Sequence, residues 1–152
     1  MKARLIVITL LAAAFLFAGC LQKEGADSEK ISPDERQAII SVLQANIKAA
    51  ENENLNGFMQ TIHPDSPAFE STRSFMKKAF AEYDFNYEIV EANVLEVSGD
   101  VARVSYIQIT RKKSGPDAIS DNQVRGEHIL KKADGRWKIY STNAQQYTDL
   151  QS

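Results

Sequence analysis

The sequence predicts an α+β fold in which three helices pack on a strongly curved, four-stranded antiparallel sheet. Between Ser32 and Tyr83 the apolar residues recur at helical spacing, in three segments separated by turn residues. From Asp84 onward they alternate instead, which is the period of a strand with one buried face. Turn signals at Gly99-Asp100 and Asp134-Gly135 divide this second part into hairpins. Helices followed by strands are typical of the α+β class.

The first twenty residues have the layout of an export signal that ends in a lipidation site. Two basic residues precede an apolar run, which ends in Ala18-Gly19 before Cys20. The run is shorter than the roughly 20 apolar residues that span a bilayer as a helix, so we expect residues 1–19 to be cleaved. The stretch from Phe17 to Cys20 resembles the bacterial lipobox, with phenylalanine where leucine is usual. This resemblance implies that Cys20 carries the lipid.

A lipidated Cys20 is an anchor and not a catalyst. Cys20 is the single cysteine of the chain, so an internal disulfide is excluded; the alternative is an ordinary buried or free cysteine. Two or more acyl chains, at about 0.8 kcal/mol per buried methylene, hold a protein durably on a membrane. We therefore expect an exported protein that is anchored to the cell membrane or envelope through Cys20. Residues 20–31 would form a flexible polar tether, and residues 32–149 the folded domain.

The charge balance predicts that nucleic acid is not a partner. The formal net charge is -2, and removal of the basic signal residues would make the balance more acidic. The remaining basic residues are scattered in short groups, as on a solvated surface.

The first helix begins at a strong capping signal and is expected over about 32–51. Ser32 is a capping residue, Pro33 suits the first helical position, and Glu35 follows three residues after the cap. The apolar face then recurs at helical spacing through Ile39, Leu43, Ile47 and Ala50.

Two shorter helices follow. Asn52 or Asn54 would cap the second, which we expect to end at about His63 because a proline follows. Ser66-Pro67 repeats the pattern of a cap and a proline, and predicts the start of a third helix that runs to about Tyr83.

The apolar alternation of the first strand changes phase twice. It runs from Phe85 to Ile89, shifts at Val90, and shifts again at Leu95. Bulges produce such shifts, and bulges bend a sheet, so we expect strong curvature. A second strand runs to about Lys112, and a loop separates it from the last two strands.

The order of helix, short helix, turn, helix and long meander resembles the nuclear transport factor 2-like superfamily. This superfamily includes relatives of ketosteroid isomerase and polyketide cyclase. The most recognisable pieces are "NENLNGFMQTIHPDSP" (52–67) and the hairpin "KKADGRWKI" (131–139). The resemblance covers about Ser32 to Tyr147, and it implies a cone whose concave sheet face holds the helices, often around an apolar pocket. It also implies that the sheet face can pair in a homodimer.

The last hairpin indicates which polar side chains share the concave face. With a turn at residues 134–135, strand alternation sets Leu130 opposite Ile139 and His128 opposite Ser141. We favour the face with Leu130, Ile139 and Trp137 as the concave one. The polar residues expected on or near it are His128, Ser141, Asn143 and Tyr106.

His128 is the sharpest site candidate in the chain. An imidazole that titrates near neutral pH in an apolar cone can move a proton, orient a ligand oxygen, or have a structural role. Because no second acid or base matches a catalytic motif, the leading hypothesis is a non-catalytic domain that binds a small apolar ligand or an envelope protein. The alternative is an isomerase, dehydratase or cyclase-like enzyme with His128 as its base.

No cofactor or metal site is expected. His63 ends the second helix next to Asp65, where a local turn interaction is the simpler role and a ligand or metal role the alternative. The chain has two histidines and no close pattern of metal-ligating residues.

Overall fold

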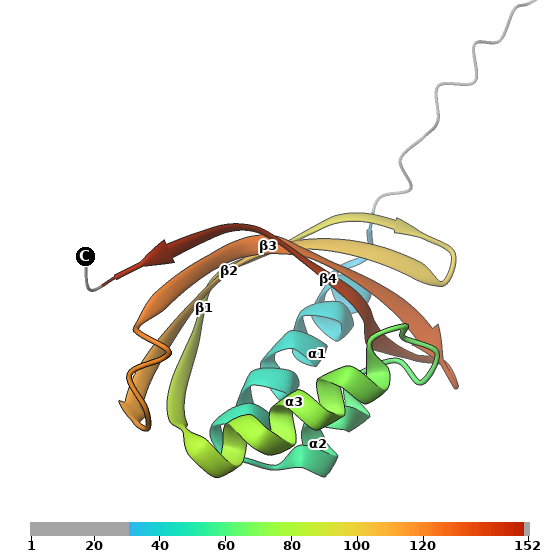
Figure 1. The fold of residues 1–152 in the computed structure, drawn as a ribbon. Helices are drawn as coiled ribbons and strands as arrows, with labels where there is room; N and C mark the ends of the chain where they lie inside the picture. The colour runs from blue at the N-terminus through green and yellow to red at the C-terminus, as the bar shows by residue number, and fades with distance from the viewer. Residues whose placement is uncertain (1–30, 151–152) are drawn as a thin grey trace, which may run out of the picture.

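The computed structural model describes residues 31–150, so the export signal, Cys20 and almost all of the tether lie outside the described residues. Three helices lie beneath an arched four-stranded sheet (Figure 1), which confirms the predicted fold class. The elements in chain order are α1 (Pro33–Glu51), α2 (Leu55–Gln60), α3 (Phe69–Glu82), β1 (Asp84–Ser98), β2 (Val101–Ser114), β3 (Asn122–Ala133) and β4 (Arg136–Asp149).

The first helix follows its capping signal as predicted. The side chain of Ser32 accepts a hydrogen bond of 3.1 Å from the backbone N–H of Glu35, which satisfies one unpaired donor of the first turn. The carboxylate of Glu35 also pairs with Lys132 at 3.2 Å. The start of α1 is therefore fixed to the hairpin that joins β3 and β4.

The second helix ends three residues earlier than expected. After Gln60 the chain straightens and runs parallel to β4 for one bridge, Ile62 with Ile139. The N–H of Ile139 donates to the carbonyl of Thr61, and the N–H of His63 donates to the carbonyl of Ile139, both at 2.8 Å. Pairing with β4 thus replaces the last helical turn.

The third helix starts at Phe69 and not directly after Ser66. The hydroxyl of Ser66 accepts a hydrogen bond of 3.3 Å from the N–H of Ala68, so the serine organises a turn ahead of the helix. Ser66 and Pro67 therefore form a turn. The prediction that they start the third helix was wrong.

The sheet is an antiparallel meander in the order β1-β2-β3-β4. Register shifts in β1 fall between Ile89 and Glu91 and between Val94 and Glu96, where the sequence predicted the two changes of phase. The expected turns at residues 99–100 and 134–135 connect the outer pairs of strands.

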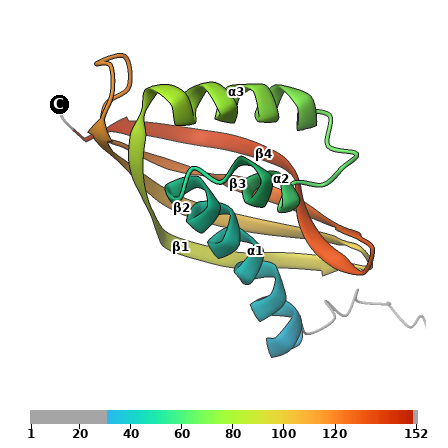
Figure 2. The same cartoon turned by 90° about the horizontal axis from the view of Figure 1, so that it is seen from below.

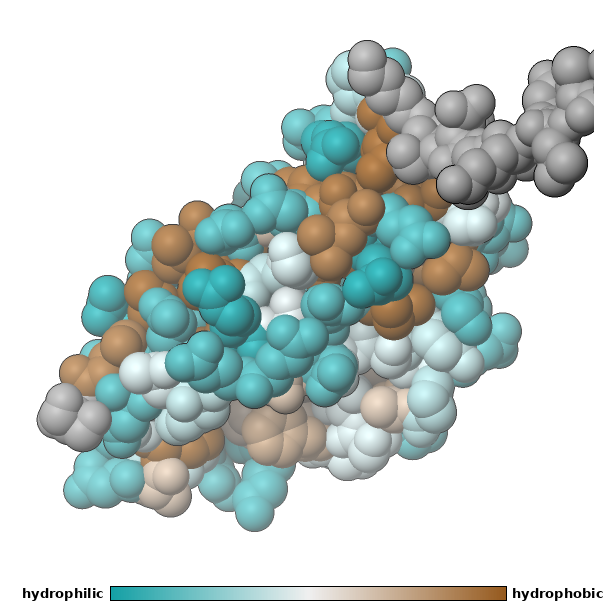
Figure 3. All heavy atoms as spheres, turned by 90° about the horizontal axis from the view of Figure 1, so that it is seen from above, coloured by the Kyte–Doolittle hydropathy of each residue, from teal (hydrophilic) through white to brown (hydrophobic). Residues whose placement is uncertain are grey.

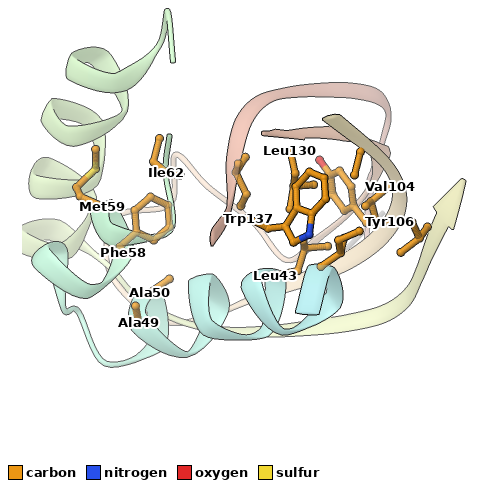
Figure 4. Packing of buried hydrophobic residues seen from close by; sticks show 14 of the residues in the cluster. Leu43, Ala49, Ala50, Phe58, Met59, Ile62, Val104, Tyr106, Leu130 and Trp137 are labelled. Atoms are coloured by element: carbon orange, nitrogen blue, oxygen red, sulfur yellow. The ribbon is translucent and has the colours of Figure 1, made fainter. Parts of the chain in front are cut away.

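The core lies between the concave face of the sheet and the helices, in two groups (Figure 4). One group joins Leu43 of α1 to Val104, Leu130 and Trp137 of the sheet. Leu130 is fully buried, and Ile139 is also in the core, so the predicted choice of concave face is confirmed. The other group contains Phe58 and Met59 of α2 and Ile62 of the segment that follows it.

The helices cover the concave face unequally. Figure 2 shows α1 across the side of the sheet near β1, and α3 beside β4. The main neighbour of α3 is α2, to which Phe80 connects it through an edge contact with Phe58 at 6.4 Å between ring centroids. Because α3 is supported by α2 more than by the strands, space remains between α3 and β4. None of the helices in residues 31–150 is long and apolar enough to cross a membrane.

Candidate functional site

A cleft of about 300 Å³ opens between β4 and the segment from α2 to α3. We call it the His128 cleft. It is lined by Asn46, Phe58, Ile62, Ser66, Ala68, Thr72, His128, Ile139, Tyr140, Ser141 and Thr142. These lining residues are apolar or uncharged polar apart from the histidine, and five of them carry hydroxyl groups. The cleft therefore offers hydrogen bonds without a carboxylate, an ammonium or a guanidinium group.

His128 is held on two sides. Its Nδ1 lies 2.8 Å from Oγ1 of Thr142, and its ring stacks on Tyr106 with 4.2 Å between centroids and 13° between planes. Burial lowers the pKa of His128 to about 4 because the charged ring would lose its hydration. The imidazole is thus neutral at pH 7.

Of the four polar residues predicted for this face, the structure brings together His128 and Tyr106, with Ser141 in the lining of the same cleft. The expected register is wrong beyond Ile139, because Tyr140 forms a bulge in β4. Leu130 pairs with Ile139 as predicted, but His128 pairs with Thr142 and not with Ser141.

The bulge also moves Asn143 away from the concave face. Asn143 pairs with Glu127 and is exposed, and Ala144 lies opposite Gly126. Thr142, which was not among the four residues predicted for this face, is the direct partner of His128.

Gly126 allows β4 to lie close to this site. A Cβ atom at Gly126 would meet the backbone oxygen of Asn143, and it would lie 3.1 Å from the hydroxyl of Tyr106. A glycine is needed here for close approach and not for an unusual backbone angle.

Two further polar residues of the cleft were missed, although the sequence carries a signal for them. Asn46 interrupts the apolar stripe of α1 three residues after Leu43, and Thr72 interrupts that of α3 between Phe69 and Met76. A polar residue on a buried stripe is informative because burial requires a hydrogen-bond partner. Asn46 has one, since its Nδ2 donates to Oγ1 of Thr61 at 2.7 Å.

The structure gives His63 a local role. Its side chain is buried, its Nδ1 accepts a hydrogen bond of 3.1 Å from the N–H of Asp65, and its ring packs edge-on against Tyr140 at 5.6 Å. Across residues 31–150, His, Cys, Asp and Glu form no group of three that could hold a metal ion.

A larger groove of about 530 Å³ lies between α1 and the β3–β4 turn. Small residues of α1 form one wall, and Arg136 and Lys138 lie on the other, next to a Trp137 ring that is only 7% exposed. We place the candidate site in the His128 cleft and not in this groove, because the cleft brings a buried serine and a histidine with a shifted pKa to one place.

Comparison with known proteins relates most of the chain to one family. The model of the family described as anti-sigma-I factor RsgI9, C-terminal domain, matches residues 41–150. The anti-sigma-I factor RsgI9 of Acetivibrio thermocellus is 34% identical over 93 residues, which are 61% of this chain and 13% of that protein. The chain therefore spans a small part of the length of this relative.

Solved structures share the fold at low sequence identity. A protein of unknown function with a cystatin-like fold from Nostoc punctiforme has a TM-score of 0.63 at 9% identity, over 76% of this chain and 92% of that chain. An NTF2-like protein from Cytophaga hutchinsonii has a TM-score of 0.61 at 15% identity, over 71% and 94% of the two chains. These likenesses confirm the expected nuclear transport factor 2-like fold, and at such identities they establish the fold alone.

Proposed function

Because the chain belongs to the anti-sigma-I factor RsgI9 C-terminal domain family, we propose that it is an envelope-anchored domain that binds a small uncharged ligand without catalysis. The ligand would lie in the His128 cleft, and lipid on Cys20 would hold the domain at the membrane. The observation that carries the proposal is a neutral His128 in a cleft whose lining has no carboxylate, lysine or arginine side chain.

The state of His128 favours binding over proton transfer. A general base works best when its pKa lies near the operating pH. With a pKa of about 4, His128 is a weak base at pH 7, and its protonated form is too scarce to act as an acid. The other lining residue that can exchange a proton is Tyr140, whose ring packs against His63.

The lining defines the chemistry of the ligand. Phe58 and Ile139 supply apolar walls, while the hydroxyls of Thr72 and Ser141 can donate or accept hydrogen bonds. Nδ1 of His128 is engaged with Thr142, so Nε2 is the ring atom left for a ligand. A charged ligand would lose its hydration without an opposite charge in the lining. At about 300 Å³ the cleft is at the small end of ligand sites.

The test is a thermal-shift and calorimetric screen of small molecules against the chain from residue 21 onward, which keeps every described residue. Each uncharged compound is paired with a carboxylate or amine analogue of similar shape. We expect the hits to be uncharged, and we expect His128→Phe and Thr142→Val to weaken binding about tenfold, the loss of roughly one hydrogen bond.

The matched control is Asn143→Ala, because Asn143 is the next residue of the same strand but lies on the outer face. It should leave affinity unchanged. Hits that are mainly ionic, or that bind His128→Phe as well as the parent, would contradict the proposal. Turnover of a hit with a rate that His128→Gln abolishes would show an enzyme instead.

Anchoring has a separate test. The lipobox-like sequence before Cys20 motivates it, and Cys20 lies outside the described residues. The full chain should incorporate labelled fatty acid and sediment with membranes, and Cys20→Ala should do neither. A Cys20→Ala protein that stays on the membrane, with no label in the parent, would exclude the anchor.

The relationship to an anti-sigma factor is proposed at the level of the shared domain. The matched family is described as the C-terminal domain of that factor, and the match covers 13% of the Acetivibrio relative. We propose that this chain corresponds to a ligand-binding part of such a protein.

A further inference from the structure

A groove with positively charged residues lies outside the His128 cleft. The groove of about 530 Å³ between α1 and the β3–β4 turn adjoins a second hollow of about 420 Å³, which α2 and the start of α3 line. Gln60 and Lys138 line both parts. We call the two parts together the basic groove. Both parts are open to solvent, and none of their cationic residues lines the His128 cleft.

Three cationic side chains follow one another along the basic groove. Arg136 lines the first part, Lys138 lines both parts, and Arg73 lines the second. No carboxylate lines either part. Within residues 31–150, no ion pair joins any of the three cations to a carboxylate. Glu35, at the start of α1, is already engaged by Lys132 at 3.2 Å. The positive charge of the basic groove is therefore not neutralised by the described part of the chain.

The outer face of the sheet has a different arrangement of charge. Figure 3 shows hydrophilic and hydrophobic side chains interspersed on that face. Arg103 lies there between Glu96 and Glu127, at 3.4 and 3.1 Å, so its charge is balanced locally. An acidic partner that bound Arg103 would have to replace these ion pairs, whereas a partner in the basic groove would find its cations without a carboxylate.

Lys138 is held in place at the junction of the two parts. Its ammonium donates a hydrogen bond of 2.8 Å to the backbone carbonyl of Gln60, and both residues line both parts. An ammonium group has three donors, so two remain for a carboxylate. Because the bond to Gln60 already orders the side chain, binding of an anion would cost less side-chain entropy.

Apolar side chains lie on both sides of this ammonium. The first part of the groove contains Val42 and Trp137. The second contains Met59 and Phe69, and the guanidinium of Arg73 lies over the ring of Phe69, 5.4 Å from its centroid. An occupant thus meets apolar side chains, then a cation, then apolar side chains again. This order suits a ligand with an acidic group between apolar ones.

These features favour an acidic polypeptide over other anions. Each part alone has the volume of a small-molecule site. Because the cations are spread over both parts, a polymer with several carboxylates suits the groove better than one compound. Single-stranded nucleic acid uses exposed aromatic rings for its bases, whereas Trp137 is only 7% exposed and the net charge of the chain is -2. An anionic membrane presents a broad surface of phosphates, which would leave the hollows unfilled.

We propose that the basic groove binds a segment of another protein in which acidic residues lie between apolar ones. One carboxylate of the segment binds Lys138, and further carboxylates bind Arg136 and Arg73. Apolar side chains of the segment fill the two hollows. The cations of this surface do not line the His128 cleft, so the domain can hold a small ligand and a protein partner at the same time.

Peptide display tests the chemistry of the occupant. A random peptide library is selected on the chain from residue 21, and peptides that also bind the double variant Arg136→Gln/Lys138→Gln are removed. We expect the enriched peptides to carry acidic residues next to apolar ones. The strongest of them should bind Arg136→Gln and Arg73→Gln about two- to fivefold more weakly than the parent, the loss of one exposed ion pair. Its affinity should also fall as the salt concentration rises.

Matched variants separate the groove from the rest of the surface. Arg111→Gln makes the same change at the other end of the sheet, outside both parts, and should leave the affinity unchanged. Ala45→Glu adds a carboxylate to the wall that α1 forms, and should weaken binding at least about tenfold. Ala81→Glu makes that change at an exposed position of α3 outside the groove, and should not.

Several results would overturn the proposal. Enrichment of basic or uncharged peptides, or of no peptide at all, would do so, and so would an affinity that Arg136→Gln and Arg73→Gln leave unchanged. Phosphatidylglycerol vesicles or a single-stranded oligonucleotide that displace the strongest peptide and bind more tightly would make a lipid or a nucleic acid the occupant. Self-association of the parent that Arg136→Gln abolishes would make it a second copy of the chain.

The chain's own acidic residues before the described part are tested in the same assay. Glu24, Asp27 and Glu29 are replaced together by their amides. We expect unchanged affinity for the strongest peptide, and a rise of about tenfold or more would make this segment the occupant instead. Binding of uncharged compounds in the His128 cleft is measured separately on Arg136→Gln, so that failure of one proposal does not obscure the other.

Discussion

The two halves of the space beneath the sheet differ in what fills them. Toward the β3–β4 turn, Leu130 and Trp137 pack with Leu43 of α1 in the core, and neither Leu43 nor Leu130 lines the groove on that side. Farther along the same two strands, His128 and Thr142 face a cleft that α3 only partly covers. One concave surface thus combines a packed region that supplies stability with a region of small hydroxyl side chains that leaves room for a ligand.

The largest loss of stability should come from a substitution in the packed half. Leu130 is fully buried, and Leu130→Ala should lower the free energy of unfolding by about 2–5 kcal/mol, through lost burial and the cavity left behind. Urea unfolding measures it. In the cleft half, Ser141→Ala should cost less than about 1 kcal/mol, because its side chain faces space that is already open. Equal losses at the two positions would mean that the cleft is packed like the core.

A smaller effect should appear on acidification. The pKa of His128 is about 4 in the fold and about 6.5 in an unfolded chain. Between these values the unfolded state binds more protons, so stability falls as the pH drops from about 6.5 to 4, by at most about 3 kcal/mol. Urea unfolding at a series of pH values would show this loss, and His128→Gln should lack it. If the free energy of unfolding falls with pH by the same amount in parent and variant, His128 would be solvated in the fold and not buried.

A third effect, of similar size, is expected at Gly126. A Cβ atom there would meet the backbone of Asn143, so Gly126→Ala should shift β4 and cost about 1–3 kcal/mol. The shift should also loosen the pair of His128 and Tyr106, and NMR chemical shifts of the imidazole would report it. As a control, Gly99→Ala adds a Cβ that meets no atom within 4 Å; it strains the β1–β2 turn, where φ is +55°, but should leave the imidazole shifts unchanged. Unchanged shifts in Gly126→Ala would show that β4 can adjust without disturbing the cleft.

The curvature of the sheet could be predicted because apolar residues report the phase of a strand. In β1 the apolar side chains at Ile89, Val90, Val94 and Leu95 make each change of phase visible. In β4 the bulge at Tyr140 is followed by Ser141, Thr142 and Asn143, which carry no hydrophobic pattern. The register change there had no signal, so the partner of His128 was assigned to the wrong residue.

The candidate site was therefore predicted in part. His128 and Tyr106 follow from alternation on strands whose register is regular up to that point. The contributions of the helices depend on how α3 sits relative to β4, which is a tertiary property. The end of α2 was displaced for a related reason, because pairing of Ile62 with β4 competes with local helix propensity.

The bridge between Ile62 and Ile139 also constrains the order in which parts of the protein can fold. The strands of the sheet are neighbours along the chain, so they can pair as they emerge. Ile62, by contrast, must wait until β4 has been made. The wall of the cleft should be among the last parts to form. Before then, the apolar side chains of α2 can pack against α1 and α3 but not against the sheet, and a chaperone or a protease could bind those left exposed.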